Sequence, residues 1–339
     1  MSVDLVTGAT GFIGRHLARR LLAAGREVRL LCRPASASRL DPETRALAEV
    51  APGDLRDEAS LRAATRGVSR VFHCAGQVSD WGPEALFREV NVAGTERLLA
   101  AAAAERVARF VHLSSIAVFG LPSPPEFDDD SPYGAGRDPY SRTKIAGEAA
   151  ALRAHRERGL PVTVLRPAVV YGPLSTWAEE PVAMIRRGKM FLLGGGRGTC
   201  HPCYVENLLD ALLLAAEHPR AVGRAYIVAD DDPLPFSAYF DHLARIVGAG
   251  PIRRSIPLPV ARAAATALEA AARLRRAEAR PLLTHAAIDI VCTPSRLSIR
   301  RIREELGYAP RYDVAAAMAE LERWFRTRAL PPLAPRRPA

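Results

Sequence analysis

Lysine is almost missing from this chain of 339 residues. The sequence has 47 lysines and arginines, and only two of them, Lys144 and Lys189, are lysine, so 45 are arginine. In such a chain a purely solvating charge would almost always be an arginine. The stretch "YSRTK" (140–144), which places a phenol four residues before an ammonium, therefore needs an explanation of its own.

Long hydrophobic runs are missing as well. No apolar run reaches the roughly 18 to 20 residues that a membrane span requires. The first residues, "MSVDLVTGATGFIG", lack the basic start and apolar middle of a signal peptide. We therefore expect no membrane span and a cytoplasmic location.

Cysteine is scarce and scattered. Five cysteines, at positions 32, 74, 200, 203 and 292, are too few and too dispersed for a disulfide framework. The stretch "CHPC" (200–203) has the spacing of a redox dithiol, but no second pair completes a zinc site. We expect no metal site here, and we favour local packing beside a cleft over a redox role.

The basic balance of the chain, a net charge of +10, does not indicate a nucleic-acid partner. Its arginines are spread along the whole chain, and no basic run is interleaved with base-stacking aromatic residues. A basic field also favours an anionic cofactor or substrate.

Strand and helix patterns alternate through the first half. Buried strands are expected at 3–8, 27–33, 47–54, 70–76, 109–115 and 161–167, and helices at 12–25, 83–104 and 139–158. This alternation predicts an α/β fold with a doubly wound parallel sheet. Ligands on such sheets bind beyond the carboxyl ends of the strands.

The rhythm changes after about residue 171, where loops punctuated by proline and glycine separate shorter elements. Residues 258–291 look helical throughout, apart from a break at Pro281, and a last helix is expected at 313–328. We expect a dinucleotide-binding domain at 1–170, completed by about 203–230. A smaller, mainly helical substrate cap would comprise 171–202 and 231–328, followed by a disordered tail at 329–339.

The stretch "TGATGFIG" (7–14) places three glycines between the first strand and the first helix. A tight turn needs Gly8, close approach of a pyrophosphate needs Gly11, and packing of helix on sheet favours Gly14. Its position between a strand and a helix predicts a dinucleotide site.

Two later residues bear on the cofactor. Arg33 lies at the end of the second expected strand, where an arginine suits the 2′-phosphate of NADP and an acid would suit NAD, so NADP(H) is favoured over NAD(H). Asp54, in "GDLRD" (53–57), could accept from the adenine amino group, cap the next helix, or do both.

Tyr140 and Lys144 are expected on one face of a helix, because they lie four residues apart. An ammonium beside a phenol lowers the phenol's pKa, as proton exchange with an alcohol or ketone near neutral pH requires. Upstream, "HLSSIAVFG" ends a strand with two serines, and a hydroxyl there could bind the reacting oxygen.

At these motifs the chain resembles the extended short-chain dehydrogenases/reductases of the epimerase/dehydratase superfamily. "TGATGFIG", "GDL", "HCAG", "NVAGT", "SSIAVFG", "YSRTK" and "LRPAVVYGP" occur in that family's order. The stretch "QVSDWGPEALFREVNVAGT" and the second half resemble the 3β-hydroxysteroid dehydrogenase-like branch. The resemblance implies a Rossmann-type domain with a substrate cap, NAD(P)-linked alcohol–ketone chemistry and a possible homodimer.

The resemblance also implies residue roles. The catalytic hydroxyl falls on Ser115, the proton donor or acceptor on Tyr140 and its supporting lysine on Lys144. Cofactor contacts fall on Thr10, Gly11, Phe12 and Ile13 for the phosphates, Asp54 and Leu55 for adenine, and Ala75, Lys144 and Pro167 for the ribose and nicotinamide. Asn91 matches an asparagine that braces the middle of the cofactor site.

We therefore expect an oxidoreductase that interconverts a secondary alcohol and a ketone on a fairly hydrophobic substrate, steroid-like or β-keto-acyl-like. Sugar dehydratases of the superfamily carry an Asp-Glu pair where this chain has Ile116-Ala117. A nucleotide-sugar epimerase with tightly bound NAD remains the alternative, followed by a non-catalytic NADP(H)-sensing protein.

Overall fold

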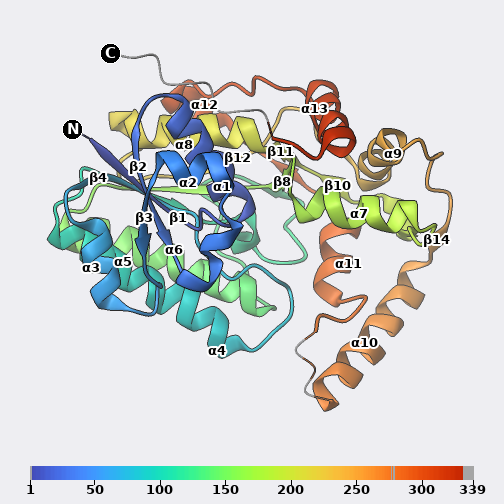
Figure 1. The fold of residues 1–339 in the computed structure, drawn as a ribbon. Coiled ribbons are helices and arrows are strands. Elements are labelled where there is room, and N and C mark those ends of the chain that lie inside the picture. Colours follow the sequence, from blue (N-terminus) through green and yellow to red (C-terminus); the bar gives the residue numbers. More distant parts are fainter. Residues whose placement is uncertain (1, 276, 278, 331–339) are drawn as a thin grey trace.

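A seven-stranded parallel sheet forms the centre of the computed structural model, which describes residues 2–275, 277 and 279–330 (Figure 1). Its strand order is β12-β7-β5-β4-β1-β2-β3. The strands are β1 (Val3–Thr7), β2 (Glu27–Cys32), β3 (Glu49–Pro52), β4 (Val68–His73), β5 (Arg109–Leu113), β7 (Val162–Pro167) and β12 (Ala225–Val228). The predicted fold class and the six predicted strands are confirmed. Residues 331–339 of the predicted tail lie outside the described residues.

Helices cover both faces of this sheet (Figure 1). The helices of this half are α1 (Phe12–Ala23), α2 (Pro42–Leu47), α3 (Glu58–Thr65), α4 (Glu84–Phe87), α5 (Gly94–Ala104), α6 (Pro139–Arg158) and α8 (Val205–Glu217). One apolar cluster joins the sheet to α1 and α8, and a second joins it to α3, α5 and α6. Because both faces are buried, the strands read as nearly continuous apolar runs, which is why the sequence predicted them well.

The remaining helices lie mostly in the second half of the chain. They are α7 (Thr176–Arg186), α9 (Phe236–Ile246), α10 (Leu258–Leu274), α11 (His285–Cys292), α12 (Arg300–Leu306) and α13 (Val314–Thr327). A third apolar cluster unites α7, α9 and α13, and a small fourth cluster joins α10 to α11. Among the described residues, no helix combines the length and apolar character needed to cross a membrane.

Short strands and turns complete the architecture. Paired short strands are β6 (Glu126–Phe127) with β15 (Arg296–Leu297), β8 (Val169–Tyr171) with β11 (Pro202–Tyr204), β9 (Leu192–Leu193) with β14 (Ser255–Ile256), and β10 (Thr199–Cys200) with β13 (Leu234–Pro235). Helical turns are η1 (Pro34–Arg39), η2 (Arg88–Ala93), η3 (Ile116–Phe119), η4 (Gly194–Gly196) and η5 (Pro219–Ala221).

Two helix predictions need correction. The helix expected at 83–104 contains a π-helical turn, η2, between α4 and α5. The helical segment expected at 258–291 has a wider break than Pro281 alone, because α10 ends at Leu274 and α11 begins at His285. Thr284 caps α11 by accepting from the Ala287 N–H, so the second helix starts where its cap stands.

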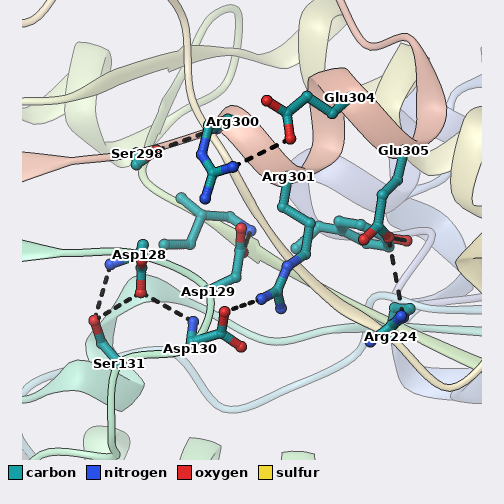
Figure 2. Close-up of polar contacts among 12 residues, drawn as sticks. Asp128, Asp129, Asp130, Ser131, Arg224, Ser298, Arg300, Arg301, Glu304 and Glu305 are labelled. Atoms are coloured by element: carbon teal, nitrogen blue, oxygen red, sulfur yellow. Dashed lines mark hydrogen bonds and ion pairs between the residues drawn. The ribbon is translucent and has the colours of Figure 1, made fainter.

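Polar contacts hold α12 against the edge of the large sheet (Figure 2). Arg301 of α12 pairs with Asp130, and Glu305 of the same helix accepts from the Tyr226 hydroxyl at 2.7 Å. The neighbouring Asp129 carboxylate accepts from the backbone N–H of Ile227 in β12 at 2.5 Å. The loop at 128–131 is thereby fixed between α12 and the sheet.

Candidate active site

A cavity of about 990 Å³ lies at the carboxyl ends of β1, β2, β4, β5 and β7. It collects every cofactor and catalytic residue predicted from the sequence. These are Gly8, Thr10, Gly11, Phe12, Ile13, Gly14, Arg33, Asp54, Leu55, Ala75, Ser115, Tyr140, Lys144 and Pro167. Residues up to 159 positions apart in the chain thus line one space, as the predicted parallel sheet requires.

The glycine turn leaves no room for side chains at two of its glycines. Gly8 has φ +74°, and a Cβ there would come within 2.8 Å of the Ala75 nitrogen. A Cβ on Gly14 would lie 2.3 Å from the carbonyl oxygen of Gly8, so Gly14 packs against the turn rather than the sheet. The first turn of α1 carries no acidic residue. Its backbone N–H groups and the positive end of the helix dipole therefore suit a pyrophosphate.

Arginines gather at the end of the cavity that lies beside β2 and the loop after β3. Arg33 is exposed just after β2, and the exposed Arg39 and Arg56, which were not predicted, line the same region. Arg56 donates to the Asp54 carboxylate at 2.8 Å, and this interaction lowers the pKa of Asp54. The alternative role of Asp54 as a helix cap is wrong, because Asp57 caps α3 by accepting from the Ala59 N–H.

Local capping explains where Tyr140 and Lys144 stand. The Asp138 carboxylate accepts from the Ser141 N–H at 2.9 Å, and Pro139 follows it as the first residue of α6. Proline suits that position because the first helical N–H needs no helical partner. Both side chains therefore leave the first two turns of α6 toward the cavity.

Ser115 stands two residues beyond the end of β5. Its hydroxyl accepts from the Ala117 N–H at 3.1 Å, which caps the turn η3. It also hydrogen-bonds the Tyr140 hydroxyl. The serine and the tyrosine predicted for catalysis are thus in direct contact.

The pKa of Tyr140 differs from the expectation. Burial raises it to about 12, a hydrogen bond with Ser115 acts in the lowering direction, and the Asp138 charge adds to the increase. The predicted lowering by Lys144 is wrong for this structure, because the ammonium lies 5.8 Å from the ring centroid and burial outweighs other effects. Tyr140 is consequently protonated at neutral pH and can donate a proton.

Lys144 is buried and held by the backbone. Its Nζ donates to the carbonyl oxygen of Leu113, at the end of β5, at 2.8 Å. Burial lowers the pKa of Lys144 to about 8, while the nearby Cys74 and Glu148 act in the raising direction. Most of the ammonium stays charged at pH 7, so it can donate hydrogen bonds into the cavity.

A buried ion pair lies behind these residues and was not predicted. Glu148, one helical turn after Lys144, accepts from Arg166 of β7 at 3.0 Å and from the Ser114 hydroxyl at 2.6 Å. Tyr133 donates to the Glu148 carboxylate at 3.0 Å. The four-residue spacing from Lys144 was the available signal, because it places Glu148 on the same face of α6.

Asn91 braces the centre of the site from the π-helical turn η2. Its side-chain oxygen accepts from the Gln77 N–H at 2.7 Å, and its Nδ2 donates to the Gln77 carbonyl at 3.0 Å and to the Thr143 hydroxyl at 3.1 Å. One amide thus ties the loop after β4 to α6.

The far half of the cavity, called here the substrate half, is lined by α7, α9, α11 and the loops at 77–80 and 280–283. Its walls are mainly apolar and include Leu174, Trp177, Met184, Met190, Phe236 and Phe240. Of the described residues in this half, one is an arginine, Arg280, and it donates to Asp80 at 2.9 Å.

The "CHPC" cysteines lie in β10 and β11, beside this half. Cys200 and Cys203 are fully buried, are not bonded to each other, and have thiol pKa values raised by burial. Because the thiolate is the reactive form, this environment argues against a redox dithiol and for packing.

Comparisons with known proteins agree with this geometry. The model of the NAD dependent epimerase/dehydratase family matches residues 5–229. The chain is 30% identical to a 2-alkyl-3-oxoalkanoate reductase of Stenotrophomonas maltophilia, over 94% of this chain and 98% of that protein. It is 29% identical to a 3 beta-hydroxysteroid dehydrogenase/Delta 5→4-isomerase of Mycobacterium tuberculosis, over 93% and 88% of the two chains. The chain also resembles the crystal structure of DesIV, a dTDP-glucose 4,6-dehydratase from Streptomyces venezuelae with NAD bound. The two are 25% identical in sequence with a TM-score of 0.75, over 96% of this chain and 97% of that chain.

Proposed function

Because the chain belongs to the NAD dependent epimerase/dehydratase family, as its motifs predicted, we propose that it is an NAD(P)-dependent oxidoreductase. It interconverts a secondary alcohol and a ketone on a hydrophobic substrate. The observation that carries this proposal is the meeting of Ser115, Tyr140 and Lys144 at the boundary between a glycine-turn cradle and an apolar chamber. The names of the full-length relatives, a reductase and a dehydrogenase, support the same reaction.

The residues of the site divide the work of the reaction. In reduction, the Tyr140 hydroxyl donates its proton to the substrate oxygen, which the Ser115 hydroxyl orients by hydrogen bonding. Lys144, fixed by the Leu113 carbonyl, supplies positive charge beside the phenol and a donor for a ribose hydroxyl. Oxidation reverses the direction of the proton.

In this proposal a nicotinamide dinucleotide lies along the cavity. The glycine turn would hold the pyrophosphate, Asp54 and Leu55 the adenine, and Ala75, Lys144 and Pro167 the ribose and nicotinamide. When bound, the nicotinamide supplies the hydride donor or acceptor. We further propose NADP(H) as the preferred form, because Arg33 and Arg39 offer cations where a 2′-phosphate would lie.

The two halves of the chain have separate roles in this proposal. Residues 1–170 with about 203–230 bind the cofactor, and 171–202 with 231–328 form the substrate cap. The apolar lining of the substrate half, rather than a cationic clamp, supports an apolar ketone over a nucleotide sugar. A homodimer stays a prediction, which light scattering of the purified protein would test.

The test is to follow NADPH and NADH absorbance with a panel of hydrophobic ketones, hydroxysteroids and nucleotide sugars. We expect net turnover on an apolar ketone or alcohol, and Tyr140→Phe should reduce it by about 10²- to 10⁴-fold while cofactor binding persists. Undiminished turnover in that variant would contradict the proposal. Conversion of a nucleotide sugar without net absorbance change would instead establish an epimerase.

A further inference from the structure

Half of the large apolar side chains exposed in the described part of this protein belong to the helical cap. In the described part of the chain there are eight, of which three lie on α10 and three line the main cavity. The α10 residues are Val260, Leu268 and Leu274, and the cavity residues are Val78, Leu86 and Leu282. Exposure is greatest for Leu274 at 86%, Leu282 at 76% and Val78 at 70%.

The outward side of α10 is mainly apolar along its length. Its inward side packs through Ala261 and Ala265 against α11. The exposed positions between Val260 and Leu274 are mostly alanines, namely 263, 264, 267, 270 and 271. A helix that is apolar on its outer as well as its inner side is normally covered on both, yet α10 extends from the body of the protein (Figure 1).

Direct contacts join the end of α10 to the mouth of the cavity. The Trp81 indole N–H donates to the Ala277 carbonyl at 3.1 Å, and the Arg273 guanidinium lies 5.4 Å from the Trp81 ring centroid. Arg280 pairs with Asp80. The exposed Leu282 follows Arg280 by two positions, and the exposed Val78 precedes Asp80 by two positions. These contacts place the loops that carry Val78 and Leu282 beside the C-terminal end of α10. The exposed face of α10 together with these two side chains is called here the apolar rim.

Basic side chains flank the apolar rim. Arg253 and Arg254 are exposed before α10, and Arg275 is exposed directly after it. The one acid of α10, Glu269, is turned inward and accepts from the His285 N–H at 2.8 Å. The surface is thus apolar in the middle and positive at its ends, in a chain of net charge +10.

We propose that the apolar rim docks this protein on the surface of a bilayer that contains anionic phospholipid. An apolar helix face with basic flanks is the pattern of helices that lie in the membrane interface. A second copy of this chain would satisfy the same apolar face, but it would cover Val78 and Leu282 at the cavity mouth. A lipid surface covers the same side chains but places the cavity against a phase that dissolves an apolar substrate, an argument that rests on the proposed function.

The test measures binding of the full chain to sedimenting vesicles of phosphatidylcholine, alone or with an equal share of phosphatidylglycerol. We expect binding to the anionic vesicles that weakens with salt. Leu268→Ser with Leu274→Ser should lower the partition coefficient by at least about tenfold, since leucine then no longer enters the lipid. Arg275→Glu should lower binding to anionic vesicles only.

Matched control variants come from α2, whose residues line neither the rim nor the cavity. Leu47→Ser and Arg45→Glu change an exposed leucine and an exposed arginine there and should bind as the wild type does. Circular dichroism checks that each variant is folded.

Three outcomes would overturn the proposal: no binding of the wild type to anionic vesicles, undiminished binding of the double leucine variant, or equal losses in the α2 controls. Dimerisation of the wild type that the double variant abolishes, without vesicle binding, would assign the rim to a second copy. Because the assay needs no substrate, its failure is distinguishable from failure of the proposed oxidoreductase activity.

Discussion

Lys144 sits where an ammonium fits and a guanidinium does not. Its side chain is 7% exposed, and its Nζ is fixed on the Leu113 carbonyl between β5 and α6. Arginine is larger, planar and always protonated, so it cannot reproduce a compact charge with rotatable donors. This difference accounts for a lysine in a chain that otherwise uses arginine.

Lys144→Arg therefore tests the lysine directly. We expect turnover to fall by about 10²-fold, because misplacement of a catalytic group by an ångström has effects of that size. Lys189→Arg changes the other lysine, which is exposed outside the cavity, and should leave turnover unchanged. Equal effects of the two variants would remove the special role of Lys144.

Arg33 decides the cofactor in our proposal. Arg33→Ser should raise KM for NADPH by roughly ten- to a hundredfold, the loss expected for one charge-assisted hydrogen bond, and should leave KM for NADH unchanged. Steady-state kinetics with each cofactor measure the two KM values. An equal rise in KM for NADPH and for NADH would show that Arg33 does not contact a 2′-phosphate.

At the scale of elements, Glu148 links three segments of the site. Through Arg166 and Ser114 it ties α6, which carries Tyr140 and Lys144, to the ends of β7 and β5. Removing one partner of a buried ion pair costs about 3–5 kcal/mol, so Glu148→Gln should strongly destabilise the fold.

Two milder variants separate positioning from stability. Ser114→Ala and Tyr133→Phe each remove one hydrogen bond from Glu148, and each should lower stability by about 1 kcal/mol. Because Ser114 adjoins Ser115, only Ser114→Ala should also lower kcat. Equal kcat values for both variants, measured beside urea unfolding, would make the network purely structural.

Local patterns account for the elements that the sequence predicted. The glycine turn, the strand ends and the Tyr140–Lys144 pair each follow from residues that are neighbours in the chain, so periodicity and spacing locate them. Glu148 and Arg166 meet across two elements, and the pKa of Tyr140 depends on atoms from several loops. These features arise from tertiary packing, which periodicity and spacing do not contain.

At the scale of the whole molecule, Asp129, which lies beside the polar contacts of α12 (Figure 2), makes the stability of the fold depend on pH. Burial raises the pKa of its carboxyl from 3.8 to about 6, with the Ile227 N–H, Arg301 and Arg166 acting in the lowering direction and Asp128 adding to the increase. Because the pKa of Asp129 is higher in the folded state than in the unfolded chain, the protonated carboxyl stabilises the fold at low pH. This stabilisation is lost as pH rises from about 4 to about 6.

Asp129→Asn keeps an acceptor for the Ile227 N–H but cannot ionise. We expect the unfolding free energy of the wild type, relative to this variant, to fall by up to about 3 kcal/mol between pH 4 and pH 7. Urea unfolding at several pH values measures the difference. A pH-independent difference between the wild type and Asp129→Asn would contradict the assignment.

The placement of β12 has a consequence for synthesis of the protein. β12 pairs with β7 in the large sheet, yet 57 residues separate the end of β7 at Pro167 from the start of β12 at Ala225. While the ribosome makes that stretch, β7 is an unpaired edge strand of the nascent sheet. Its residues are all buried in the finished fold. An exposed apolar edge of this kind pairs with strands of other chains and leads to aggregation. Ribosome release before residue 228 should therefore yield fragments that depend on chaperones, even when they contain all three proposed catalytic residues.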